Sequence, residues 1–147
     1  MMVDRFVSAP IDLPDDAEDT YRADLVFYDV DHSGASYEAR IFLNSPDADA
    51  DTPRDDPNYA GSFHIFGHGG CFGDVGHCDI PTERDPFDFR PPHQLVPASK
   101  TVVITDAFKR IIGPHDKTMT VTVVAFAPGD TPNDVLQFDT VRLLTYQ

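Results

Sequence analysis

The chain has 147 residues and a formal net charge of −14, and most of that charge comes from aspartate. Such a surface repels the phosphates of nucleic acids and anionic lipids, so neither class is expected as a partner. The length suits one domain with one core, and thirteen prolines argue against long helices.

Residues 1–20 are rich in proline and aspartate and are predicted to form an irregular N-terminal segment. Residues 21–147 are predicted to form a single β-sandwich domain. The N-terminal segment lacks the apolar core of a signal peptide, and no apolar run approaches the about 20 residues that span a bilayer. A cytoplasmic location without membrane association is therefore expected.

Apolar and polar residues alternate with a period of two in several later segments, which predicts β-strands. Residues 22–30 and 36–44 flank the turn sequence Asp31-His32-Ser33-Gly34 and are expected to pair as an antiparallel hairpin. A short helix is expected at 107–112, capped by Thr105-Asp106. The pattern predicts an all-β fold, an antiparallel sandwich or barrel of about seven strands with one short helix. The remaining predicted strands are residues 59–68, 100–105, 118–127 and 137–146.

The acidic segment 45–58 carries three prolines. Apart from these prolines, it contains no apolar residue larger than alanine. Aspartate-rich loops often bind calcium, but the spacing of an EF-hand, with its glycine and terminal glutamate, is absent. The segment is therefore interpreted as a solvated loop.

Potential metal ligands are concentrated between His64 and Cys78. This stretch holds three of the six histidines, both cysteines and five glycines. Imidazole and thiolate are the ligands that suit copper and zinc, and glycines allow a backbone to fold tightly around one point. The sequence therefore predicts a metal site, with copper as the first choice and zinc as the alternative. The candidate ligands are His64, His68, Cys71, His77 and Cys78.

Two alternatives for this cluster stay open. Cys71 and Cys78 can instead form a disulfide, with the glycines serving only a tight loop. Because adjacent residues of a strand point to opposite faces, only one of His77 and Cys78 is expected to be a ligand. A set with two histidines and one cysteine suits copper, whereas two of each suit tetrahedral zinc. The other histidines, His32, His93 and His115, are interpreted as surface residues.

Several segments resemble, in order, the C-terminal β-sandwich domain that follows the dicopper domain in plant polyphenol oxidases and bacterial tyrosinase-family proteins. They are SYEARIFLN at 36–44, AGSFH at 60–64, VVITDAFKRI at 102–111 and the valine-rich strand at 118–127. The dicopper domain itself holds its metals on helices with paired histidines, and this chain has no such helices. The resemblance implies a domain that covers or serves a copper enzyme, with HGGCFGDVGHC as an addition of its own.

These observations predict a copper-binding protein with a role in copper handling, in electron transfer or as an accessory to a tyrosinase-like or other oxidase. One alternative is a small metal-dependent oxidase or oxygenase with an open coordination position. Another is a structural or interaction module that is cross-linked by zinc or by a Cys71–Cys78 disulfide. A copper–thiolate site absorbs visible light, whereas zinc and a disulfide do not, so colour separates these hypotheses.

Overall fold

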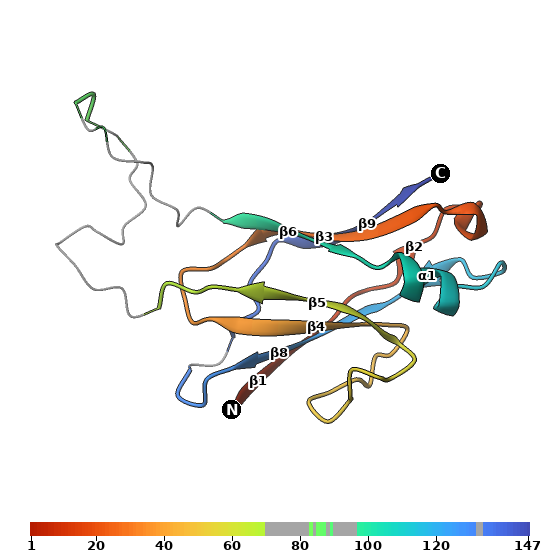
Figure 1. Cartoon of the computed structure of the whole chain (residues 1–147), viewed down its shortest axis with the longest axis horizontal. Coiled ribbons are helices and arrows are strands. Elements are labelled where there is room, and N and C mark those ends of the chain that lie inside the picture. Colours follow the sequence, from red (N-terminus) through yellow and green to blue (C-terminus); the bar gives the residue numbers. More distant parts are fainter. Residues whose placement is uncertain (70–82, 84, 88, 90–96, 132–133) are drawn as a thin grey trace.

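Two antiparallel sheets pack face to face around one core in the computed structural model, which describes residues 1–69, 83, 85–87, 89, 97–131 and 134–147 (Figure 1). The described part therefore forms an all-β sandwich, as predicted, with seven strands of six or more residues. The four-stranded sheet has the order β1 (Met2–Val7), β8 (Val121–Ala127), β4 (Tyr37–Leu43), β5 (Tyr59–Ile65). The three-stranded sheet has the order β6 (Ala98–Val103), β3 (Arg22–Val30), β9 (Thr140–Tyr146).

The core forms because the inward faces of both sheets carry apolar side chains at alternate positions. Along β8, Val121, Val123 and Ala125 are fully buried in the main core, while Val124 and Phe126 lie on the outer face of the sheet. The alternation predicted for residues 118–127 is therefore confirmed. The inward residues of β4 are Tyr37, Ala39, Ile41 and Leu43.

The smaller elements gather at one end of the sandwich (Figure 1). A two-residue strand β2 (Ile11–Asp12) pairs with β7 (Thr118–Met119), and a short 3₁₀ helix covers Ala17–Asp19. The helix α1 (Thr105–Ile111) lies at one end and contacts β3, β4 and β5 (Figure 1). The helix begins two residues earlier than predicted.

The expected cap of α1 is wrong in its chemistry. No side chain caps the N-terminus, whose N-cap residue is Ile104. The hydroxyl of Thr105 instead accepts a hydrogen bond from the backbone N–H of Ala23 at 3.1 Å. Thr105 therefore fastens the helix to the adjacent three-stranded sheet, and sequence spacing gives no sign of this contact.

The prediction that residues 1–20 are irregular is wrong for the first strand. Residues Met2–Val7 form β1, which pairs with β8 along its full length, from Met2 opposite Ala127 to Val7 opposite Thr122. Pairing is favourable because β8 would otherwise leave one row of backbone hydrogen-bonding groups unmatched.

The expected hairpin between residues 22–30 and 36–44 is also wrong. The strand β3 pairs with β6 and β9, while β4 pairs with β5 and β8, so the two strands belong to different sheets. A register shift lies between Phe27 and Val30, and Asp29 has a positive φ of 54°. This irregularity turns the chain, and the connection at 31–36 crosses from one layer to the other.

Among the helices in the described ranges, none combines the length and the apolar character needed to cross a bilayer.

Candidate metal centre

The register of the four-stranded sheet brings the exit of β5 beside the entrance of β4. Tyr37, the first residue of β4, lies opposite Ile65, the last residue of β5. The residues that leave β5 therefore meet the connection that precedes β4. We call residues 32–36 and 67–69 together the histidine junction. It lies at the end of the sandwich opposite α1 (Figure 1).

Backbone hydrogen bonds hold the histidine junction together. The N–H of His68 donates to the carbonyl oxygen of His32 at 3.0 Å, and the N–H of Gly69 donates to the carbonyl oxygen of Gly34 at 2.6 Å. The N–H of Gly67 donates to the hydroxyl of Ser36 at 2.9 Å. The backbones of Gly67, His68 and Gly69 are thus held against the segment that precedes β4.

The two imidazole rings of the junction face each other. The Nδ1 atoms of His32 and His68 are 3.4 Å apart, and the ring planes lie at 68° with centroids 5.2 Å apart. The Nδ1 atom of His68 is also 3.2 Å from the carbonyl oxygen of His32. Both side chains are partly buried, so their nitrogens meet at a position that still has access to solvent.

This separation suits two ligands of one metal ion. With metal–nitrogen bonds of 2.0 to 2.1 Å, two nitrogens lie about 3.3 Å apart at a tetrahedral ion and about 3.6 Å apart at a trigonal one. The observed 3.4 Å falls within that range. The same separation also permits a hydrogen bond from one neutral imidazole to the other, so the geometry alone fits both arrangements.

Glycine is required at position 67 because two backbone segments touch there. A Cβ atom at Gly67 would lie 2.2 Å from the carbonyl oxygen of Gly34 and 2.3 Å from the carbonyl carbon of Ala35. These are backbone atoms, so no side-chain rotation relieves the clash. At Gly34 itself, a Cβ atom would meet nothing within 4 Å. The close approach at Gly67 is what allows His68 to reach His32.

Asp31 orders the turn that presents His32. Its Oδ1 atom accepts hydrogen bonds from the backbone N–H of Ser33 at 2.9 Å and from the Ser33 hydroxyl at 2.7 Å. These two bonds, followed by the charge of His32, hold the pKa of the Asp31 carboxyl below its ordinary value. The carboxylate is therefore ionised beside the histidine pair at neutral pH, where it favours a bound cation.

The structure brings together only part of the predicted ligand set. His68 is in the junction, but His64 is exposed on the outer face of the four-stranded sheet, opposite Glu38 in the register. The candidates Cys71, His77 and Cys78 lie outside the described residues. Within the described residues, no group of three or more histidine, cysteine, aspartate or glutamate side chains is placed to hold a metal.

Sequence reasoning placed His32 among the surface residues, whereas the structure pairs it with His68. The two are 36 positions apart, and neither periodicity nor a spacing rule links them. The strand pairing alone is sufficient to bring the two histidines together. Because Tyr37 lies opposite Ile65, the segment before β4 and the segment after β5 meet at the same end of the sheet.

The surroundings of His64 are an ion-pair network. Burial opposes ionisation of Glu38, but a hydrogen bond from Arg40 at 2.8 Å and the charges of Arg40, Arg54 and His64 outweigh it and lower the pKa of its carboxyl. Arg54 also donates directly to the same carboxylate. His64 therefore lies beside a carboxylate already bound by two arginines.

A pH dependence follows from the lowered pKa of Glu38. Because this pKa is lower in the folded state, the ion pairs stabilise the fold above the unfolded value of about 4.3, and the gain is lost as pH falls through the folded value. The difference in unfolding free energy between wild type and Glu38→Gln is expected to be about 1 kcal/mol or less at pH 7 and to shrink as pH falls below about 4.3. Urea unfolding across this pH range measures it. A difference that grows on acidification would contradict the network.

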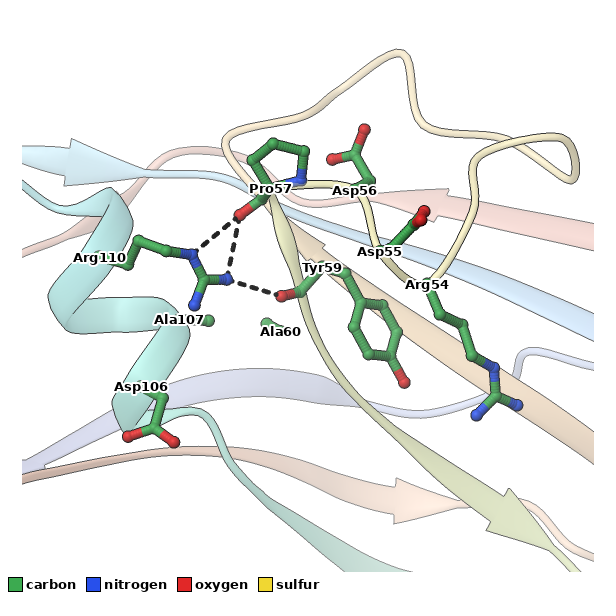
Figure 2. Close-up of a pocket in the computed structure, with 9 residues that line it drawn as sticks. All are labelled: Arg54, Asp55, Asp56, Pro57, Tyr59, Ala60, Asp106, Ala107 and Arg110. Carbon is green, nitrogen blue, oxygen red and sulfur yellow. Dashed lines mark hydrogen bonds between the residues drawn. The ribbon is translucent and has the colours of Figure 1, made fainter.

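A hollow of about 350 Å³ lies at the end of the sandwich that carries α1, away from the histidine junction. It is formed between α1 and the segment that leads into β5 (Figure 2). Arg110 on α1 donates through Nη2 to the carbonyl oxygens of Pro57 at 3.1 Å and Tyr59 at 3.3 Å, and through Nε to that of Pro57 at 3.4 Å. Its guanidinium is thus used to bind backbone. The carboxylates Asp55, Asp56 and Asp106 also line the hollow. The mixed charges and the backbone bonds indicate a structural contact between helix and loop.

The Arg110→Ala variant tests this structural role. Loss of the three hydrogen bonds at an exposed site is expected to lower the free energy of unfolding by about 1 kcal/mol. Lys109→Ala, which removes an exposed cation from the adjacent position, is expected to change it by less than about 0.5 kcal/mol. Equal effects of the two substitutions in urea unfolding would show that Arg110 does not fasten the helix.

Comparison with solved structures shows which known fold this one is similar to. Recombinant latent aurone synthase, a polyphenol oxidase, co-crystallised with hexatungstotellurate(VI), matches 97% of the chain with a TM-score of 0.57 and 14% identity. The same enzyme from its natural source matches with a TM-score of 0.53 and 14% identity, again over 97% of the chain. No protein-family model matches the chain, and no curated protein matches it.

These matches cover nearly all of this chain but only one domain-sized part of the polyphenol oxidase chains. The chain spans 24% of the length of the polyphenol oxidase chains that it resembles, which is consistent with the sequence resemblance to their C-terminal domain. At 14% identity the likeness is one of fold. The chain therefore has the sandwich fold found in part of latent polyphenol oxidase.

Proposed function

We propose that this chain is a transition-metal-binding β-sandwich protein that holds copper in a site centred on His32 and His68. The observation that carries the proposal is the 3.4 Å separation of the two Nδ1 atoms, which suits a shared metal ion. The ionised Asp31 beside His32 and the overall charge of −14 both favour a cation at this position.

The remaining ligands are proposed from the sequence that follows the junction. Cys71 is three residues beyond His68, so its Cα atom is within about 11 Å of that of His68 whatever the path of the chain. One thiolate added to two imidazoles makes the donor set of a copper–thiolate site, and one of His77 and Cys78 supplies a fourth ligand. His64 is left out of this set because it faces Glu38 on the outer face of the sheet.

The proposed role is that of an accessory protein to a tyrosinase-family oxidase, in copper handling or electron transfer. Two findings support it. The fold is similar to that of part of latent polyphenol oxidase, and the histidine pair is partly exposed at one end of the sandwich. A site at such a position is accessible to a docking partner that donates or receives copper or an electron.

Metal analysis of the purified chain tests the proposal. The protein is prepared without added metal or a histidine tag, analysed for metals, and then loaded with copper for a visible spectrum. One copper per chain with an intense thiolate band is expected, together with loss of the band in Cys71→Ser. Absence of copper binding, combined with no titratable thiol, would establish a Cys71–Cys78 disulfide and overturn the proposal. Stoichiometric zinc without a visible band would assign the zinc alternative.

A further inference from the structure

A cavity borders the histidine junction and shares Asp31, Gly34 and Ala35 with its surroundings, but neither His32 nor His68 lines it. It has a volume of about 110 Å³, and its lining includes Asp31, Gly34 and Ala35 on one side and Thr131, Asp134 and Val135 on the other. The side chain of Tyr37 lines it and is only 5% exposed. Within the described part of the chain, the buried Tyr37 hydroxyl has no hydrogen-bond partner. Buried hydroxyls are nearly always hydrogen-bonded, so the Tyr37 hydroxyl is available to a bound species at this position.

The other polar side chains around the cavity offer only oxygen. Its lining includes Asp31, Thr131 and Asp134, and no described lysine, arginine, histidine or cysteine is among the lining residues. Both hydrogen bonds from Ser33 go to Oδ1 of Asp31. They fix the orientation of this carboxylate beside the cavity. Carboxylate and hydroxyl oxygens without nitrogen or sulfur are the donors that hard cations prefer.

Neighbouring contacts hold this arrangement in place. The backbone N–H of Leu136 donates to Oδ2 of Asp4 at 3.0 Å, and the N–H of Asp31 donates to the carbonyl oxygen of Gln137 at 2.8 Å. Residues 134–137 are therefore fastened to β1 and to the end of β3. The Tyr37 hydroxyl, which has no hydrogen-bond partner in the described part of the chain, is then an oxygen ligand available to a cation.

We propose that this cavity binds one calcium ion through the carboxylates of Asp31 and Asp134 and the hydroxyl of Tyr37. Calcium takes six to eight oxygen ligands in flexible geometry and accepts water among them. A volume of 110 Å³ equals that of about three or four water molecules, which leaves room for an ion that keeps part of its hydration. Magnesium demands a stricter octahedron and is expected to bind more weakly here.

Terbium luminescence excited through tyrosine tests the calcium site in the full chain. Terbium replaces calcium at oxygen sites, and the chain has no tryptophan, so tyrosine is the sensitiser. In chelator-treated protein at physiological ionic strength, terbium is expected to bind at one saturable site from which calcium displaces it. Tyr37→Phe is expected to lose most of the luminescence, and Asp134→Asn to weaken terbium and calcium binding about tenfold or more.

Two control variants separate this site from the general acidity of the surface. Asp130→Asn removes a carboxylate near the cavity but outside its lining, and Tyr59→Phe removes the tyrosine beside the acidic segment 45–58. Both are expected to keep wild-type luminescence. Full luminescence in Tyr37→Phe, loss of it in Tyr59→Phe, or absence of a saturable site would each overturn the proposal. Tyr37→Phe removes only a hydroxyl, and its unchanged circular dichroism would show that it folds.

The calcium and copper sites can fail independently. His68→Ala is expected to lose copper and retain terbium, whereas Asp134→Asn is expected to retain copper and lose affinity for terbium. Loss of both ions in either variant would show that the two are one site, and the separate calcium site would then be withdrawn.

Discussion

Replacing either His32 or His68 by alanine is expected to reduce copper affinity more than about 100-fold. Each substitution removes one of two imidazoles whose Nδ1 atoms are 3.4 Å apart. Even groups that only orient a metal ligand typically change affinity 10- to 100-fold, so loss of a ligand itself has a larger effect. Competition with a chelator of known affinity measures the loss.

Two histidines serve as controls for this pair. His64 is exposed beside Glu38, and His115 is exposed after α1. Alanine at either position is expected to leave copper affinity unchanged. If His64→Ala lost copper while His32→Ala kept it, the ligand set would be the local one predicted from sequence, and the junction would be only a hydrogen-bonded histidine pair.

The second large effect is expected for Gly67→Ala. Its Cβ atom would lie 2.2 Å from the carbonyl oxygen of Gly34, so the backbone must move to admit it. Overpacking of this kind lowers the free energy of unfolding by about 1 to 3 kcal/mol. The displacement also moves His68 away from His32, so copper affinity is expected to fall together with stability. Urea unfolding and chelator competition on the same sample measure the two effects.

Gly34→Ala is the matched control within the same junction. A Cβ atom there meets nothing within 4 Å, and replacing glycine by alanine in such space leaves stability unchanged or slightly raised. Equal destabilisation by the two substitutions would show that the close approach at Gly67 does not hold the junction.

The strands were predictable because their inward residues alternate over a shared core. Val121, Val123 and Ala125 face one way along β8, and the sequence shows that pattern directly. The sequence does not reveal the first strand because both of its faces carry apolar residues. Met2 and Phe6 pack against the core while Val3 and Val7 are partly exposed on the other face, so a period of two does not stand out.

Pairing between strands was much less predictable than the strands themselves. The short connection at 31–36 suggests a hairpin, yet a bulge in β3 sends the chain to the other sheet. The candidate site depended on this pairing. His68 was found because it lies near cysteines in the sequence, but its partner His32 comes from a contact 36 positions away that only the sheet register creates.

The central claim is that His32 and His68 bind the same metal ion. Pulsed electron paramagnetic resonance of the copper(II)-loaded chain tests it most directly, because a copper ion bound through Nδ1 couples to the remote Nε2 of each imidazole ligand. The wild type is expected to show one more coupled remote nitrogen than His32→Ala: two against one if Cys78 is the fourth ligand, and three against two if His77 is. The same number in both proteins, or none in the wild type, would contradict the claim.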